Sequence, residues 1–418
     1  MRPTGRLHIG HYFGALQNWI KLQNEPQYEC YFFIADWHAL TSDYADTSQV
    51  AQNTIEIATD WLAAGLDPER CTMFMQSAVP EHAELNLLLA MVTPLGWLER
   101  VPTYKEALDN IKDKDLHTYG FLGYPVLQTA DIVMYGEPES ELVVPVGEDQ
   151  VSHVELSREI VRRFDFFYGL SVKSELFAPG AKKSLAALLK KVGWPSDASG
   201  TASEVTPQGV QTAVRKHAEE TGLANFMDAL GDLSRFVSLT SVLREPEHML
   251  THTPRIPGTD GRKMSKSYNN FISLSESDES IRAKSKVMMT DPARKRRQDP
   301  GNPDVCPVYD WHKLFSPRET LEWSAHGCRT AGIGCIECKS AMADHLIKWI
   351  GPVRQRREDY QQQPQHVLNI LNTGSQRARM VAQQTMDRVR EAVFGWDKMR
   401  ANLAAVPQGG TQNVKAGG

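Results

Sequence analysis

The feature that most constrains the fold is an alternation of short apolar runs with amphipathic stretches in the first half of the chain. Residues 30–40 (CYFFIADWHAL) and 71–76 are predicted to be buried strands, and residues 48–64 and 82–93 to be helices. A further strand is expected near residues 141–146. Successive strand–helix units of this kind are typical of a doubly wound α/β domain with a parallel sheet.

The rest of the chain departs from this pattern. Residues 169–243 turn to Ala, Lys, Ser and Gly with helical runs, and after about residue 290 strand signals fade into long helical patterns. The predicted fold is therefore a Rossmann-like doubly wound parallel sheet with an inserted small helical module and an α-helical C-terminal domain. The expected division is a Rossmann part in two pieces (1–168 and 244–290), an inserted helical module of unknown role (169–243), a helical domain that carries a cysteine cluster (291–402), and a disordered tail (403–418).

Composition restricts the partners only weakly. The chain has 418 residues, a formal charge of −5 and 41% hydrophobic residues. Because the net charge is negative, any RNA would have to be held by local basic patches rather than by the overall electrostatic field of the protein. No stretch approaches the roughly 20 apolar residues that cross a bilayer, and the N-terminus lacks the apolar core of a signal peptide. We therefore expect a cytoplasmic protein that does not contact a membrane.

The segment Pro3-Thr4-Gly5-Arg6-Leu7-His8-Ile9-Gly10-His11 precedes an amphipathic helix predicted over residues 12–22. A helix N-terminus offers free amides and a favourable dipole to an anion such as a polyphosphate. Gly10 lets a ligand approach closely, and the imidazoles of His8 and His11 can donate to phosphate oxygens. Taken alone, two histidines at a helix start are more often surface residues.

A second string, Gly261-Arg262-Lys263-Met264-Ser265-Lys266-Ser267, lies far downstream. Its two lysines flank a small serine-bearing turn and can neutralise the charge that moves to pyrophosphate when an α-phosphate is attacked. By itself, a solvated charged loop explains the string equally well. The two strings in one chain, in this order and beside strand–helix elements, are much more specific than either alone.

Together these strings resemble the two signatures of class I aminoacyl-tRNA synthetases, with no substitution in His8-Ile9-Gly10-His11 or Lys263-Met264-Ser265-Lys266-Ser267. The resemblance implies that ATP, with Mg²⁺, is gripped from both sides while the amino-acid carboxylate attacks the α-phosphate. It assigns catalysis to His11, Lys263, Lys266 and Ser267. It assigns ATP binding to Arg2, Pro3, Thr4, His8, Gly10, His11, Ile256, Lys263, Met264, Ser265, Lys266 and Ser267.

One departure from the family concerns the first loop. The family has a strand before it and a glutamine where this chain has Arg2. We therefore expect the first strand of the Rossmann part to be truncated.

Residues 123–133 and 143–153 resemble two blocks of bacterial tryptophanyl-tRNA synthetases, and the related tyrosyl enzymes lack the Ala130-Asp131-Ile132 string. A buried carboxylate accepts from the indole N–H and disfavours phenylalanine, so Asp131 is the candidate acceptor; a helix-cap or surface aspartate is the alternative. The resemblance places Tyr124, Gln128, His38, Val144, Val146 and Gln150 in the tryptophan pocket, with Gln128 standing where some relatives have methionine. It places Gly147, Glu148 and Asp149 at the ATP ribose.

The resemblance thus predicts a homodimeric tryptophan–tRNA ligase acting on L-tryptophan and tRNA(Trp), with the helical domain (291–402) binding the tRNA anticodon. Two alternatives stay open: a tyrosine-activating enzyme of the same class, which Asp131 argues against, and a non-catalytic nucleotide- or RNA-binding relative, which the two intact lysines argue against.

Four of the six cysteines, Cys306, Cys328, Cys335 and Cys338, crowd into one short stretch. Their spacing suits a four-thiolate zinc or iron–sulfur site, with four free thiols as the alternative. A subset of bacterial tryptophanyl enzymes has a similar cluster that holds [4Fe-4S], so we favour iron–sulfur over Zn²⁺.

Two basic groups are candidates for holding tRNA phosphates. One is the run over residues 291–303, with four cations just before Cys306, and the other comprises Arg354, Arg356 and Arg357. A solvated charged face is the alternative for both.

Overall fold

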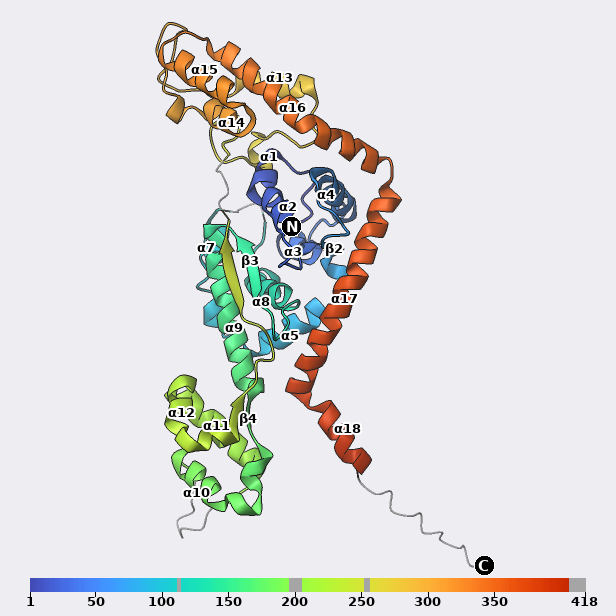
Figure 1. Cartoon of the computed structure of the whole chain (residues 1–418), viewed down its shortest axis with the longest axis vertical. Helices are drawn as coiled ribbons and strands as arrows, with labels where there is room; N and C mark the ends of the chain where they lie inside the picture. The colour runs from blue at the N-terminus through green and yellow to red at the C-terminus, as the bar shows by residue number, and fades with distance from the viewer. Residues whose placement is uncertain (111–113, 195–204, 252–255, 406–418) are drawn as a thin grey trace, which may run out of the picture.

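The structure is a computed structural model that describes residues 1–110, 114–194, 205–251 and 256–405. The molecule is elongated: the helices within residues 278–361 form one end, the strands within residues 72–146 lie near the middle, and the helices within residues 182–230 form the other end (Figure 1). Most of the tail predicted for residues 403–418 lies outside the described residues. Within them, no helix combines the length and apolarity that crossing a membrane requires.

The predicted strand–helix alternation is confirmed near the N-terminus. Strand β1 (Tyr31–Ile34) pairs in parallel with β2 (Thr72–Met75), and the helices between and after them are α3 (Asp36–Asp43), α4 (Val50–Ala64) and α5 (Glu81–Val92). Both strands carry buried apolar side chains because helices cover them, so their sequences lack a two-residue alternation.

The strand predicted over residues 30–40 is wrong in its second half, because helix α3 already begins at Asp36. The Asp36 carboxylate accepts from the backbone N–H groups of Trp37 and Ser77, each at 3.0 Å. A carboxylate at this end of a helix also interacts favourably with the helix dipole. The apolar run therefore bends from strand into helix at Ala35.

A second parallel pair lies further along the chain. Strand β3 (Leu142–Val146) pairs with β6 (Pro246–Leu250), in agreement with the strand expected near residues 141–146. Helix α8 (Tyr119–Val133) precedes β3 and α9 (Val151–Gly169) follows it. In the described part of the chain, Met1 lies beside the end of β1: its ammonium donates to Phe33 O at 2.6 Å, and its carbonyl accepts from Ala35 N at 2.8 Å.

The inserted module has an apolar core of its own, which includes Leu176, Leu188, Val214 and Phe226. Its helices are α10 (Lys182–Lys191), α11 (Pro207–Thr221) and α12 (Leu223–Leu230). Beside these helices, β4 (Leu170–Val172) and β5 (Val237–Leu239) pair antiparallel where the chain enters and leaves the module. A short ladder of this kind joins the two chain ends that a module must bring together.

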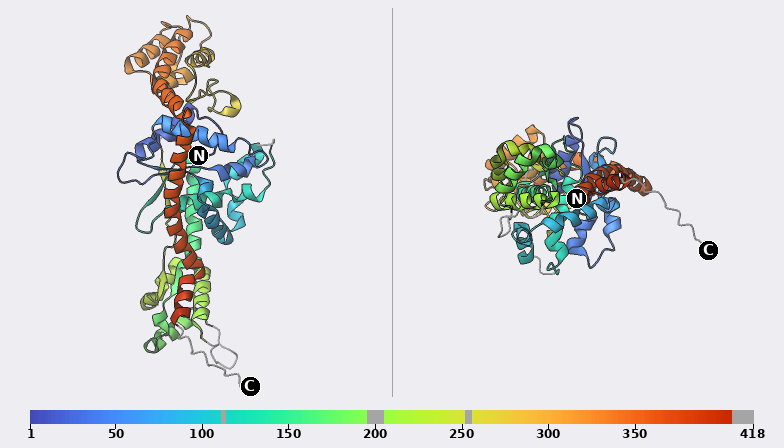
Figure 2. Two further views of the ribbon diagram at one scale, coloured as in Figure 1. Left: turned by 90° about the vertical axis from the view of Figure 1, so that its right-hand side faces the viewer. Right: turned by 90° about the horizontal axis from the view of Figure 1, so that it is seen from below.

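The C-terminal part is helical, as predicted, and its long helices are α13 (Asp278–Val287), α14 (Pro307–Phe315), α15 (Arg318–Arg329), α16 (Cys335–Gln361), α17 (Pro364–Phe394) and α18 (Trp396–Ala405). Helix α17 runs back along the strand-bearing part of the molecule (Figures 1 and 2). At Gly374 it touches β2, where a Cβ atom would lie 1.8 Å from the carbonyl oxygen of Met73. Only glycine permits this approach.

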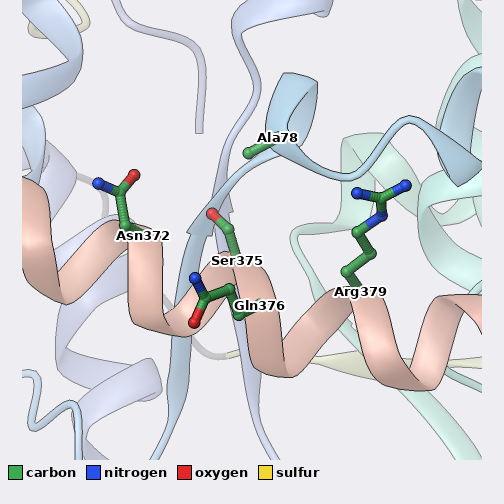
Figure 3. Close-up of a pocket in the computed structure, with 5 residues that line it drawn as sticks. All are labelled: Ala78, Asn372, Ser375, Gln376 and Arg379. Carbon is green, nitrogen blue, oxygen red and sulfur yellow. The ribbon is translucent and has the colours of Figure 1, made fainter.

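A cavity of about 270 Å³ lies beside this contact. It is lined by Ala78, Asn372, Ser375, Gln376 and Arg379, four of which come from α17 (Figure 3). Ser375 also accepts a hydrogen bond from Met75 N at 3.3 Å, so α17 holds the carboxyl end of β2 directly.

Of the three arginines of α16 that were predicted to hold tRNA phosphates, Arg357 is wrongly assigned, because it is buried against a carboxylate of the same chain. For Arg354 and Arg356 the expectation stays a prediction. Arg357 is 2% exposed, and its Nε lies 2.5 Å from Oδ1 of Asp60. Arg354 pairs with Asp278 at 2.7 Å, and Arg356 donates to the backbone at 2.8 Å. A guanidinium that is buried against a carboxylate cannot also neutralise a phosphate without leaving that carboxylate unpaired.

Candidate active site

Hydrogen bonds from two backbone N–H groups hold the first signature loop in place. Leu7 N donates to Oδ2 of the buried Asp60 at 2.6 Å, and Ile9 N donates to Ile272 O at 3.0 Å. The helix predicted over residues 12–22 is present as α1 (Ile9–His11), a π-helical turn (Tyr12–Leu16) and α2 (Gln17–Leu22). Because Asp60 also binds Arg357, the loop is tied to the helical C-terminal part.

The rings of the two histidines of this loop lie against each other at a tilt of 37°, with centroids 3.7 Å apart. Burial lowers the pKa of His8 to about 3, helped by His11 and Lys266, and burial lowers the pKa of His11 to about 4, helped by Lys266. Both rings are therefore neutral at pH 7. A neutral imidazole still offers one N–H donor, so each ring can donate to a phosphate oxygen without bringing a full charge into the site.

The two signatures, more than 250 residues apart in the chain, meet at Gly10. A Cβ atom there would lie 2.9 Å from Cε1 of His8 and 3.3 Å from Sδ of Met264. Lys266 Nζ donates to Thr4 O at 2.8 Å. Burial lowers the pKa of the Lys266 ammonium, while nearby Asp60 acts in the opposite direction. The structure thus brings the first loop and the lysine loop together into one site.

Asn270 braces the lysine loop, and the sequence reasoning missed it. This residue is 2% exposed; its Oδ1 accepts from Ser265 N at 2.8 Å, and its Nδ2 donates to Lys263 O at 3.0 Å. Gly258 leaves it room, since a Cβ there would lie 2.4 Å from Nδ2 of Asn270. Lys263 is exposed, as a group that meets a substrate phosphate should be.

The other nucleotide candidates take different positions. Ile256 and Met264 belong to the apolar core, and Arg2 donates to Ser42 at 3.3 Å. Gly147 and Glu148 follow β3 directly, at the carboxyl end of a parallel strand, where such sheets bind ligands. The side chains of Asp149 and Ser267 lie outside the described part of the structure.

Asp131 is a buried carboxylate on α8, 4% exposed, rather than a surface or capping residue. His38 Nε2 lies 2.7 Å from its Oδ2, His82 Nδ1 lies 2.6 Å from its Oδ1, and Gln76 Nε2 lies 2.8 Å from both oxygens. Burial opposes ionisation, but hydrogen bonds from His38 and His82 outweigh it and lower the pKa of Asp131 to about 2. Asp131 is therefore a buried, ionised acceptor at neutral pH, held by three polar side chains.

Gln76, which the sequence reasoning did not select, links two of these elements. Its Oε1 accepts from Trp37 N at 3.2 Å and from His38 N at 3.4 Å, while its amide nitrogen donates to Asp131. It follows β2 immediately. The strand-end rule that pointed to His38 applies equally to Gln76, so this signal was available in the sequence.

The remaining pocket candidates lie on two elements. Tyr124 and Gln128 precede Asp131 on α8 by seven and three residues, so the three share one helix face. Tyr124 OH bonds Thr103 at 2.5 Å and His153 at 2.9 Å. Val144 and Val146 share one face of β3; Gln150 stands at the start of α9.

The four clustered thiols lie near enough to one another in the helical part to affect one another's ionisation. The pKa of Cys338 is raised to about 12 by burial first, then by Cys306, Cys328 and Cys335. Nη1 of Arg294 lies 3.8 Å from Sγ of Cys328, and Nε2 of His312 lies 3.4 Å from Sγ of Cys338.

Within the described ranges, however, no group of three or more His, Cys, Asp or Glu side chains is arranged to hold a metal ion. The predicted metal centre is thus not supported by the side chains as they stand.

Arg294 belongs to the basic run that was expected to hold phosphates, and for this residue the expectation is wrong. It is 8% exposed and donates to Ile333 O at 2.6 Å and to Arg297 O at 3.0 Å. The other three cations, Lys295, Arg296 and Arg297, are exposed. They line a hollow of about 870 Å³ together with Trp323 and Ile336.

Known proteins resemble this chain in both sequence and structure. Residues 1–183 and 225–350 match the family described as tRNA synthetases class I (W and Y). The tryptophan–tRNA ligase of Ralstonia nicotianae is 45% identical over 94% of this chain and 96% of its own length; that of Thermotoga maritima is 41% identical over 94% and 97%. The crystal structure of tryptophanyl-tRNA synthetase from Campylobacter jejuni with ADP and tryptophan superposes with a TM-score of 0.69 at 25% identity, covering 94% of this chain and 98% of that one.

Proposed function

The chain belongs to the class I tRNA synthetases for tryptophan and tyrosine and, among them, to the tryptophan–tRNA ligases; we propose that it activates L-tryptophan with ATP and Mg²⁺ and transfers it to tRNA(Trp). The observation that supports this most is the buried, ionised Asp131. An indole N–H satisfies this carboxylate, whereas phenylalanine would leave it without a substrate donor. Pyrophosphate exchange that depends on tryptophan and not on tyrosine tests the proposal.

In the activation step, a carboxylate oxygen of tryptophan attacks the α-phosphorus of ATP, and the bond from that phosphorus to the bridging oxygen of pyrophosphate breaks. No proton needs to move, so the chain contributes position and charge. The neutral imidazoles of His8 and His11 donate to phosphate oxygens, and the ammonium groups of Lys263 and Lys266 balance the charge that collects on pyrophosphate. Lys266 exchanges its bond to Thr4 O for one to a phosphate oxygen.

For the remaining contacts, we propose that the first loop, Gly147, Glu148 and Asp149 bind ATP from one side and residues 263–267 from the other. Tyr124, Gln128, Val144, Val146 and Gln150 line the pocket around the amino acid, with His38 beside Asp131. The positions of these residues on one face of α8, one face of β3 and the start of α9 support this assignment.

We propose that residues 291–402 bind tRNA and that residues 1–168 and 244–290 form the catalytic domain. The exposed Lys295, Arg296 and Arg297 suit phosphates. Trp323, which is 39% exposed in the same hollow, offers a face on which a base can stack. The enzyme would act in the cytoplasm, where its tRNA substrate is charged.

A homodimer is also proposed. Helices α5 and α6 (Leu95–Leu98) expose Leu87, Met91 and Leu95, which are 55%, 69% and 58% accessible. Large apolar side chains gathered in this way are unfavourable in water and favour burial against a second copy of the chain.

We further propose that Cys306, Cys328, Cys335 and Cys338 hold a [4Fe-4S] cluster, or Zn²⁺, and so clamp the loops around α14, α15 and α16. The mutual approach of the four thiols and the adjacent guanidinium of Arg294, which favours thiolates, support the proposal. The side chains would have to turn toward a common point when the group binds.

Protein purified without oxygen is expected to be brown and to contain iron and acid-labile sulfide, and Cys328→Ser should lose both. Cys71→Ser, which alters a buried thiol outside the cluster, is the matched control and should keep them. Colourless protein with one zinc would decide for Zn²⁺, and protein with neither metal would contradict the proposal.

A further inference from the structure

His82 is a buried histidine that the activation chemistry described above does not use. Its side chain is 0% exposed and lies at the start of α5, directly behind Asp131. Nδ1 of His82 lies 2.6 Å from Oδ1 of Asp131, and Nε2 lies 2.7 Å from the hydroxyl of Tyr135. The ring therefore has a polar partner on each nitrogen and no access to water.

These partners fix the proton positions on the ring. An ionised carboxylate only accepts hydrogen bonds, so Nδ1 of a neutral His82 must carry the hydrogen that reaches Asp131. Nε2 then accepts from the hydroxyl of Tyr135, whose pKa is raised well above its usual value by burial. Tyr135 thus donates to His82, and His82 donates to Asp131. A partner on the far nitrogen, here Tyr135, orients the histidine ring.

The other partners of Asp131 differ from His82 in exposure. Gln76 is 0% exposed, like His82, whereas the side chain of His38 is 13% exposed. His82 acts on Oδ1 alone and His38 on Oδ2 alone, while Gln76 reaches both oxygens. The carboxylate is thus held from the buried side at Oδ1, and Oδ2 is the oxygen nearer the accessible side.

We propose that His82 is a positioning residue for the selection of tryptophan: it holds Oδ1 of Asp131 so that Oδ2 faces the indole N–H of the substrate. The proposal rests on the proposed function, since it assumes that Asp131 receives the indole. Phe33 and Phe74 surround the His82 ring, with centroids 5.9 and 6.1 Å away. In this apolar surrounding water is a poor replacement for the ring as a donor, so without the ring Oδ1 would keep only its bond from Gln76 and the carboxylate would be held less firmly.

The test compares His82→Leu, His82→Asn and Tyr135→Phe with the unchanged chain in pyrophosphate exchange. Tryptophan is compared with an analogue that carries sulfur in place of the indole N–H, 3-benzothienylalanine. His82→Leu should raise the KM for tryptophan by about 10-fold or more, change the KM for ATP less than about twofold, and reduce the preference for tryptophan over the sulfur analogue.

The conservative variants distinguish the loss of the hydrogen bond to Asp131 from the loss of packing around the His82 ring. The amide of His82→Asn can still donate to Oδ1 and should recover part of the preference for tryptophan. Tyr135→Phe, which keeps the ring stacked 4.4 Å from Tyr31, should reduce that preference slightly, as His82→Leu does more strongly. His366→Leu, at an exposed histidine of α17, is the matched control and should change nothing.

An unchanged preference in folded His82→Leu, or an equal rise in both KM values, would overturn the role of His82. If His82→Leu does not fold, the preference of His82→Asn and Tyr135→Phe decides: two unchanged ratios overturn the role. If the unchanged chain exchanges pyrophosphate without responding to tryptophan, the proposed function fails instead.

Discussion

Replacing Asp131 with asparagine is expected to raise the KM for tryptophan in pyrophosphate exchange by about 100-fold, because a charge-assisted bond to the indole is lost. The asparagine amide would also point donors at His82 or Gln76, which are donors themselves. The KM for ATP should change little, since ATP is bound by the two signature loops. Steady-state exchange with each substrate varied in turn gives both values.

The buried carboxylate Asp165 provides the matched control. It is 7% exposed and accepts from the backbone N–H groups of Val242 and Leu243 beside the inserted module. Asp165→Asn keeps a side-chain oxygen that can accept both bonds, and it should leave the KM for tryptophan unchanged. A similar loss of tryptophan and ATP binding in Asp131→Asn would indicate general disruption and contradict the role of Asp131 as the indole acceptor.

The variant Lys266→Ala is expected to reduce the kcat of exchange by about 100- to 1000-fold, the usual cost of removing one preorganised group that stabilises a developing charge. The same residue joins the two signature loops through Thr4 O, so the loss should fall on the chemical step and not on tryptophan binding. Single-turnover measurement of adenylate formation checks this directly.

Lys266→Arg keeps the charge but changes its shape and reach, and it should recover only part of the rate. Lys313→Ala removes a surface lysine that is paired with Asp310 on α14, and it serves as the control. An unchanged rate of adenylate formation in Lys266→Ala would contradict the electrostatic account of activation.

Much of the fold could be predicted, because the apolar runs at β1, β2 and β3 and the periodic stretches of α4 and α5 are local signals. The errors occur where a distant partner decides the local structure. Residues 36–40 continue an apolar run but form a helix, since Gln76 and Ser77, far along the chain, bind its first turn. Strands β4 and β5 are three residues each, too short to leave a pattern.

The candidate site divides in the same way. Its substrate-facing groups, such as Asp131, Lys263 and Lys266, stand in strings that could be identified from the sequence. The residues that hold them in place could not: Asn270 and His82 act through hydrogen bonds that form only in the folded chain, and a lone buried polar residue carries no sequence signal. The burial of Arg357 against Asp60, 297 positions away in the chain, was likewise invisible, so Arg357 was wrongly included in a candidate phosphate site.

The most direct test of the central claim is ATP–pyrophosphate exchange measured separately with each of the twenty amino acids. The unchanged chain should exchange with tryptophan, and tyrosine and phenylalanine should give rates near the background without amino acid. Exchange that depends on tyrosine and ignores tryptophan, or no amino-acid-dependent exchange at all from folded protein, would contradict the assignment of this chain as a tryptophan-activating enzyme.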